Sequence, residues 1–260
     1  MKYQIIASGS EGNLIYIEAG GAKILIDAGI SFKQACMRFD LKNKQIDAIL
    51  VTHEHSDHVR HLSMYLKKTK ASLYINEASF KELVHKQGFD YHGYDIKYIE
   101  PNKKYKIKEL IFMPLILSHD VANCFGYLFV YKKASLAYIT DTGFIKTPYI
   151  TLLQNVKHLI IESNHDIQML NESSRPRELK NRILSIYGHM SNITCGEVLN
   201  KILKTKKLEC VTLAHLSREC NTPEIAIDTV LEHIEGDYLP TIKVAKQYEA
   251  LEVEEISEDD

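Results

Sequence analysis

The sequence lacks several features that would assign it to common protein classes. It has no run of 18 or more apolar residues, which argues against a membrane-spanning helix, and the apolar part of residues 1–6 is too short for a secretory signal. The five cysteines are odd in number and widely spaced, and no pair has the C-x-x-C spacing. These absences predict reduced thiols in a cytoplasmic protein and count against a disulfide framework or a cysteine-based zinc site.

An excess of charge of either sign is also missing, because the formal net charge of the 260 residues is −2. The chain as a whole therefore exerts no electrostatic pull on nucleic acid. Lysines are concentrated locally at 67–70, 103–108 and 201–207, and residues 252–260 are acidic. We interpret most of these clusters as solvated surface, but a basic cluster beside an active site could hold a phosphate backbone.

No segment rich in Pro, Gly or Ser divides the chain. We therefore expect a single domain over residues 1–250, followed by an acidic, disordered tail over 251–260. Apolar patterning and turn signals predict a β-rich first half and a mixed α/β second half, which fits two sheets packed face to face with helices outside. The predicted strands cover 4–7, 14–18, 23–27, 46–52, 71–75, 96–99, 110–117, 125–131, 136–140, 156–161 and 208–213, with a last strand closing at Val244. The predicted helices cover 31–39, 58–68, 77–86, 177–186, 192–203 and 223–234.

The most informative segment is the THEHSDH run at residues 52–58, which directly follows the predicted strand. Four potential metal ligands stand in this short run: His53, His55, Asp57 and His58. Two imidazoles at alternate positions, followed by an adjacent Asp and His, can serve two neighbouring ions from one loop. Imidazole and carboxylate are natural ligands of hydrolytic zinc or manganese. A His-rich surface turn is the alternative, but nothing structural requires such a ligand density after a strand.

Four other predicted strands also end in polar residues, namely Asp27, His119, Asp141 and His215. Together with the HxHxDH run, and in this order, they resemble the signature positions of the metallo-β-lactamase-fold hydrolases. The resemblance implies an α/β fold in the form of an αββα four-layer sandwich, with two mixed sheets face to face and helices outside. It also implies a metal-dependent hydrolase.

The resemblance further implies a ligand scheme for two divalent ions, zinc or manganese. One ion would take His53, His55 and His119, the other would take Asp57, His58 and His215, and Asp141 would bridge them. Asp27 would lie beneath the loop and orient the ligands rather than bind metal; capping a turn explains this residue equally well. His55 favours hydrolysis, because relatives that perform redox chemistry with iron tend to carry a carboxylate at the corresponding place.

Four further segments, at 8–13, 162–166, 188–192 and 215–221, are similar to the YycJ/WalJ/VicX-type branch of this fold. That branch is associated with exonuclease action on DNA from the 5′ end and with the bacterial cytoplasm. Cys220 departs from the pattern, because relatives carry a more polar residue there. The departure leaves the expected metal ligands untouched.

The same segments supply candidate catalytic and substrate-binding residues. We expect Asp57 and His189 to be catalytic, with His189 binding the scissile phosphate or protonating the leaving oxygen. The candidate substrate contacts are Ser8, Ser10, Asn13, His165, Ser191 and Asn192, because Gly-flanked hydroxyls and helix starts suit a phosphate. The alternatives are a hairpin turn at 8–13, ordinary capping at Ser191 or Asn192, and structural histidines at 165 and 189.

The leading functional hypothesis is a dinuclear metal-dependent phosphodiesterase that acts on DNA as a 5′ to 3′ exonuclease. A hydroxide bridging the two ions would attack phosphorus in line. A second hypothesis keeps the site but changes the substrate to a small phosphodiester, a thioester or a lactone. A third, a non-catalytic metal-binding regulator, is disfavoured because the whole ligand set is present. The sequence leaves the native metal, the substrate, the pathway and the oligomeric state open.

Overall fold

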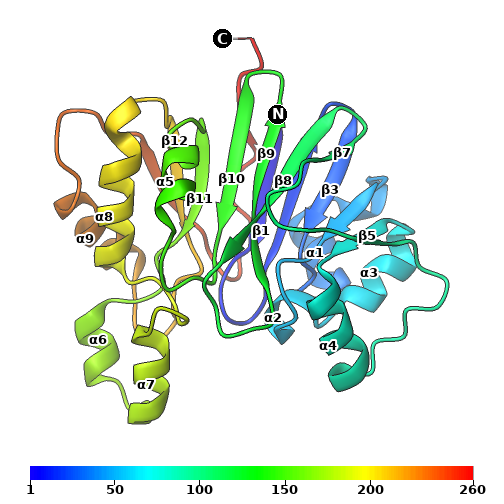
Figure 1. Cartoon of the computed structure of the whole chain (residues 1–260), viewed down its shortest axis with the longest axis horizontal. Helices are drawn as coiled ribbons and strands as arrows, with labels where there is room; N and C mark the ends of the chain where they lie inside the picture. The colour runs from blue at the N-terminus through cyan, green and yellow to red at the C-terminus, as the bar shows by residue number, and fades with distance from the viewer. Residues whose placement is uncertain (260) are drawn as a thin grey trace.

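Two mixed seven-stranded sheets form the centre of the molecule (Figure 1). A computed structural model describes residues 1–259. The first sheet has the order β14-β1-β2-β3-β4-β5-β6 and the second has the order β13-β12-β11-β10-β9-β8-β7. The strands of the first sheet are β1 Lys2–Ala7, β2 Leu14–Ala19, β3 Ala22–Ile26, β4 Ala48–Leu50, β5 Ser72–Ile75, β6 Ile96–Tyr98 and β14 Glu254–Glu255. Those of the second are β7 Tyr105–Ile107, β8 Leu110–Leu117, β9 Cys124–Tyr131, β10 Ala134–Ile139, β11 His158–Glu162, β12 Cys210–Ala214 and β13 Thr241–Val244.

Each sheet contains a run of parallel strands. In the first sheet β3, β4, β5 and β6 are parallel, and in the second sheet β10, β11, β12 and β13 are parallel. The carboxyl ends of parallel strands meet at one edge of a sheet, so the segments that follow them are brought together. The two face-to-face sheets therefore gather polar residues from both halves of the chain at one edge of the sandwich.

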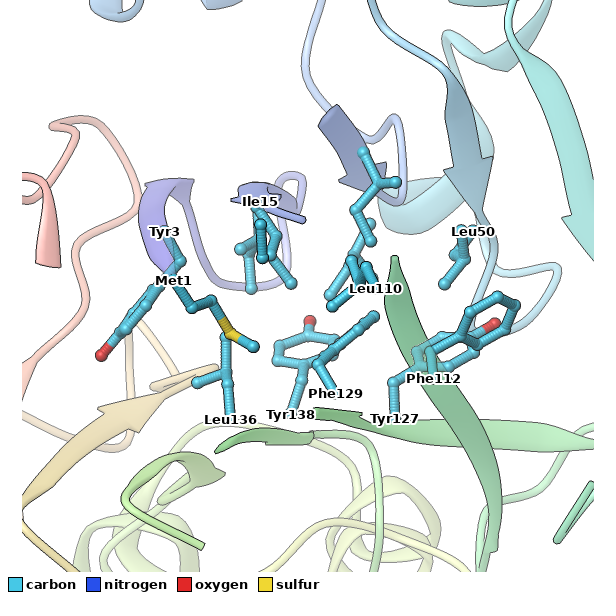
Figure 2. Packing of buried hydrophobic residues seen from close by; sticks show 14 of the residues in the cluster. Met1, Tyr3, Ile15, Leu50, Leu110, Phe112, Tyr127, Phe129, Leu136 and Tyr138 are labelled. Atoms are coloured by element: carbon cyan, nitrogen blue, oxygen red, sulfur yellow. The ribbon is translucent and has the colours of Figure 1, made fainter. Parts of the chain in front are cut away.

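The core between the sheets is rich in aromatic side chains (Figure 2). Tyr3 and Leu50 from the first sheet face a layer that includes Phe112, Tyr127 and Tyr138 from the second. Burying one such large apolar side chain contributes roughly 1.5–3 kcal/mol. The apolar patterning that predicted the strands is thus what holds the two sheets together.

Helices cover both outer faces of the sandwich, which confirms the predicted four-layer αββα architecture (Figure 1). The first sheet is covered by α1 Phe32–Arg38, α3 Leu62–Thr69 and α4 Glu77–Gln87, and the second by α5 Thr147–Leu153, α8 Asn192–Ile202 and α9 Pro223–Glu232. Three short helices, α2 Ser56–Val59, α6 Ile167–Glu172 and α7 Arg177–Leu184, lie toward the edge where the parallel strands end. The 3₁₀ turns are Leu41–Asn43 and Leu203–Thr205. Within residues 1–259, no helix is long and apolar enough to cross a bilayer.

Several local predictions differ from the structure. The helix expected over 58–68 is split into α2 and α3, because His61 leaves the helical conformation with φ −113° and ψ 12°. The short elements β7, α5 and α6 were not predicted.

The prediction of a disordered acidic tail is wrong for residues 251–259. Strand β14 pairs antiparallel with β1, Ile256 is buried, and the Met1 ammonium group lies 2.9 Å from a Glu258 carboxylate oxygen. Two apolar residues in the tail, Leu251 and Ile256, pack on the core between the sheets, so the tail is not uniformly polar. Asp260, the last residue of the predicted tail, lies outside the described residues.

Candidate metal centre

The THEHSDH segment follows β4, which is completely buried. It lies at the edge of the sandwich where the parallel strands end. Phe125 N donates to the Thr52 carbonyl, and α2 begins at Ser56, one residue after His55. This single turn of helix places Asp57 and His58 beside the two earlier histidines. Both His53 and His58 are completely buried.

The structure brings all seven predicted ligands together. The ligand atoms of each of three groups lie within 4.8 Å of one another, and the groups are His53, His55 and His119; Asp57, His58 and His215; and His53, His58 and Asp141. The first two are the sets expected for the two ions. Asp141 joins a member of each set in the third group, which is the position that a bridging carboxylate requires.

Polar atoms at the centre of this cluster make no hydrogen bond within residues 1–259. They are Nε2 of His53, Nε2 of His215 and Oδ2 of Asp141, and all three are buried. A buried polar atom left without a partner costs about 1–3 kcal/mol. Nitrogen and carboxylate oxygen donors that converge without partners fit divalent zinc or manganese, which would satisfy them.

The carboxylates in the cluster control protonation of the imidazoles. Burial lowers the pKa of His53 well below its ordinary value. For His58 burial acts in the same direction, but the carboxylates of Asp57, Asp27 and Asp141 outweigh it and raise the pKa well above the ordinary value. The pKa of His215 rises to about 10, because the Asp141 carboxylate and its other acidic partners overcome burial. A position that attracts protons this strongly also attracts metal cations, which would displace those protons on binding.

Asp27 supports the cluster from beneath, as the orienting role requires. Its Oδ2 accepts a hydrogen bond from Nδ1 of His58 at 2.7 Å, and its Oδ1 accepts from the Thr52 backbone N at 2.9 Å. The first contact leaves Nε2 of His58 directed toward the carboxylates of Asp57 and Asp141, both at 3.3 Å. This geometry supports ligand orientation over turn capping.

Glu162, at the end of β11, is a buried functional candidate that sequence reasoning assigned no role. Its Oε1 accepts from Nδ1 of His189 at 2.8 Å and from Nδ1 of His215 at 3.0 Å, and its Oε2 accepts from the backbone N of Thr142 and of Met190. Burial opposes ionisation, but interaction with His189 and His215 lowers the pKa of Glu162 to about 2. The carboxylate thus fixes both imidazoles with Nδ1 protonated, which frees each Nε2 to face the site.

A pocket of about 220 Å³ opens directly over the cluster. His189 lines it, and the side chain of Asp57, predicted to be catalytic, is partly exposed to it. The pKa of His189 is raised, because the carboxylates of Glu162 and Asp141 outweigh the effect of burial. Other lining residues are Asn164 and Ser217, which belong to the segments noted in the sequence but were given no role, and Arg175 and Arg182, which the sequence did not single out.

Only one of the six predicted substrate contacts, Ser10, lines this pocket. Ser8 is buried, and its Oγ accepts from the His215 backbone N at 2.9 Å. Asn13 is also buried, with Nδ2 lying 3.1 Å from Nε2 of His58 and 3.4 Å from the Asp57 carboxylate. These two residues hold the metal-centre loops rather than face the pocket.

The structure places the other three substrate candidates in a buried network behind His189. His165 is 1% exposed, and its Nδ1 lies 3.3 Å from the Asn164 side-chain oxygen. Ser191 is the N-cap of α8. Asn192 accepts hydrogen bonds from Ser163 and Asn221 and is completely buried. None of the three lines the metal pocket, and the contacts of Ser191 and Asn192 match the structural alternatives.

Three residues of the site have an unusual backbone conformation. Asp27, Asp141 and His215 have φ values of 63°, 61° and 55°, in the left-handed region that non-glycine residues seldom adopt. Asp27 and His215 directly follow β3 and β12, and Asp141 lies two residues after the end of β10. Such conformations cost of order 1–3 kcal/mol and cluster at functional sites. Their coincidence with the converging side chains marks this edge as the functional centre.

Comparison with known proteins identifies the family. Residues 22–216 match the Beta-lactamase superfamily domain. Exodeoxyribonuclease WalJ from Streptococcus pneumoniae serotype 2 (strain D39 / NCTC 7466) is 34% identical over 239 residues, which cover 90% of this chain and 88% of that protein. Exodeoxyribonuclease YycJ from Bacillus anthracis is 31% identical over 249 residues, with 90% and 89% covered.

Among solved structures, the metallo-β-lactamase-fold protein YhfI from Bacillus subtilis superimposes with a TM-score of 0.73 at 14% identity, covering 96% of this chain and 99% of that one. At that identity the likeness concerns the fold alone, and it agrees with the observed four-layer sandwich. The family match, the two relatives and the converging histidines and carboxylates together place this chain in the β-lactamase superfamily, in its WalJ/YycJ-type branch, as a metal-dependent hydrolase.

Proposed function

We propose that this protein is a dinuclear metal-dependent phosphodiesterase that degrades DNA as an exonuclease from the 5′ end. The observation that carries the proposal is the convergence of seven imidazole and carboxylate side chains, with three buried polar atoms that make no hydrogen bond within residues 1–259, beneath an open pocket. The names of the WalJ and YycJ relatives support DNA as the substrate.

The position of each side chain in the site suggests its role in the reaction. The two ligand sets would hold zinc or manganese ions, and the bound metal would supply a nucleophilic water at neutral pH and offset the negative charge of the phosphate. His189 is held through Nδ1 by Glu162, and its Nε2 is left to bind the scissile phosphate or to donate a proton to the leaving oxygen. Ser10 and Ser217 line the same pocket and offer hydroxyl groups to phosphate oxygens.

A cytoplasmic location is part of the same proposal. All five cysteines are free thiols, and four of them are buried, which suits a reducing compartment.

The proposal is tested with purified protein reconstituted with zinc or manganese and with duplex DNA labelled at either the 5′ or the 3′ end. We expect progressive loss of nucleotides beginning at the 5′ end. His58→Ala should abolish this activity and reduce the metal content, whereas His92→Ala, a change at an exposed histidine, should leave both unchanged. Turnover of a bis-aryl phosphodiester or a thioester without any degradation of DNA would refute the assignment and favour a small-molecule hydrolase.

A further inference from the structure

Two further pockets adjoin the metal pocket at Ser10. One, of about 280 Å³, is lined by Arg38, Arg60 and Tyr248, and the other, of about 260 Å³, is lined by Ser217 and Arg218 among others. Ser10 lines all three, so the depressions meet around the loop at residues 8–13. We call the two outer pockets together the Ser10 groove.

The groove carries positive charge that its own acidic residues do not neutralise. Neither Arg38 nor Arg60 forms an ion pair with a carboxylate in the part of the chain that the structure describes. Nη1 of Arg38 donates to the Gln247 carbonyl at 3.0 Å, and Nη2 of Arg60 lies 3.4 Å from Oγ of Ser56. Two guanidinium groups that no carboxylate neutralises suit the phosphates of a nucleic acid backbone.

An exposed aromatic ring stands beside these arginines. The Tyr248 side chain is 52% exposed, and its hydroxyl accepts a hydrogen bond from Nη1 of Arg218 at 3.3 Å. Arg218 is also paired with Glu11 at 2.8 Å, so the ring is anchored at its polar end while its face remains open. Anchored aromatic rings next to cationic side chains are the usual platform for stacking the bases of single strands.

Helix α7 also lines the metal pocket. Leu179, Arg182 and Ile183 of this helix form its wall. Arg182 bonds to Asp120, and Arg175 pairs with Glu219 at 3.0 Å, which ties the α6–α7 segment to loops on both sides of the cluster. In Figure 1, α6 and α7 stand side by side at the lower edge of the molecule, below the second sheet and its helices.

We infer that one DNA strand lies along the Ser10 groove, with its internal phosphates at Arg38 and Arg60 and a base stacked on Tyr248, and that its terminal nucleotide enters the metal pocket and stops against α7. This inference rests on the proposed function and deepens it. A path that is open at the groove and closed at α7 explains why cleavage begins at a strand end. Substrate affinity then depends on nucleotides beyond the one being removed.

The first test measures the contribution of the groove to binding. Metal-loaded, full-length protein is titrated against fluorescent single-stranded oligonucleotides whose phosphorothioate linkages slow cleavage, and the apparent Kd is recorded at several salt concentrations. Arg38→Gln and Arg60→Gln should each reduce the slope of log K against log salt by about 0.7, the value for one lost phosphate contact on a single strand. Lys106→Gln, at an exposed cation on the edge strand β7, serves as the control and should leave the slope unchanged.

The second test concerns stacking. Tyr248→Ala should raise Kd about 5- to 140-fold for long oligonucleotides and leave it unchanged for a dinucleotide too short to reach the ring. Tyr98→Ala is the matched control, because that ring is 51% exposed on the distant edge strand β6. Melting temperatures of all variants show whether they fold, and Arg60→Gln carries the test if Arg38→Gln unfolds.

The outcomes separate the two proposals. Degradation of linear DNA with wild-type affinity, slope and length dependence in the groove variants would refute the strand path and leave the exonuclease assignment intact. Cleavage of circular single strands as fast as linear ones would refute both the stop at α7 and the exonuclease assignment. If DNA of every length and form is resistant, the proposed function fails, and the inference fails with it.

Discussion

Replacing Glu162 with Gln tests whether the centre depends on the carboxylate at the end of β11. All four groups that contact Glu162 are hydrogen-bond donors: Nδ1 of His189 and of His215 on one oxygen, and two backbone N–H groups on the other. A glutamine side chain has the same shape but only one acceptor oxygen. Whichever way the amide lies, its NH₂ group faces two of those donors.

The magnitude follows from this count. Two buried donors without an acceptor cost about 1–3 kcal/mol each, so Glu162→Gln should lower the free energy of unfolding of the metal-free protein by roughly 2–6 kcal/mol. Loss of a carboxylate that orients a ligand histidine should also weaken metal binding by about 10- to 100-fold. Activity should fall with metal affinity, because Glu162 holds Nδ1 of His215 and thereby orients its Nε2 toward the metal centre.

The assay combines urea unfolding with metal titration. Glu54→Gln is the matched control: Glu54 is also buried and lies within the THEHSDH segment, but its carboxylate accepts from Ser79 Oγ at 2.5 Å and belongs to none of the three ligand groups. We expect Glu54→Gln to cost stability while metal affinity remains that of the wild type. Equal metal affinity in Glu162→Gln and the wild type would refute the orienting role.

Three further predictions address the nucleophilic site and the fold. His189→Gln should lower the DNA cleavage rate by ~10²-fold or more with metal content intact, since the residue lines the pocket and its Nδ1 is held by Glu162. Loss of metal in that variant would show that its role is misassigned. Chelation should lower the melting temperature, because free metal at 100 times its Kd adds about 2.7 kcal/mol of stability; an unchanged melting curve would argue against a metal centre. Burial lowers the pKa of His158 to about 4, so between pH 6.5 and 4 the unfolded chain takes up a proton that the folded protein does not. Stability should therefore fall with decreasing pH, by about 2 kcal/mol at pH 5, and His158→Gln should remove this component; an identical pH dependence in both proteins would contradict it.

The sequence predicted the sheet framework because long apolar runs and turn residues are local signals. Strands β8, β9 and β12 are buried over most of their length, and the caps Ser31, Thr222 and Ser191 mark the starts of α1, α9 and α8 as side-chain acceptors. The missed helices α5 and α6 have seven and six residues, too few for a clear helical period. Strand β14 forms by pairing with β1 at the edge of the sheet, and no local sequence pattern indicates this long-range pairing.

The metal cluster could be predicted because its members follow strands in a recognisable order, whereas Glu162 could not be assigned. Its role arises from register: β11 pairs in parallel with β12 so that Glu162 lies opposite Ala214, one residue before His215. Sequence alone gives no register between strands separated by some fifty residues. The one usable signal was that Glu162 ends the strand lying between those that lead to Asp141 and His215.

The left-handed backbone at Asp141 permits a test of the strand-end geometry that is independent of catalysis. Asp141→Gly and Asp141→Ala both remove the carboxylate, so they should be equally inactive. In extended or helical backbone the alanine variant would be the more stable, because glycine loses more conformational entropy on folding. At φ 61° the order should reverse, since a Cβ in this conformation costs roughly 1–2 kcal/mol that glycine avoids. Urea unfolding of the two metal-free variants measures the difference directly. An alanine variant more stable than the glycine variant would mean that the chain does not turn at Asp141 in the way that points this carboxylate between the two ligand sets.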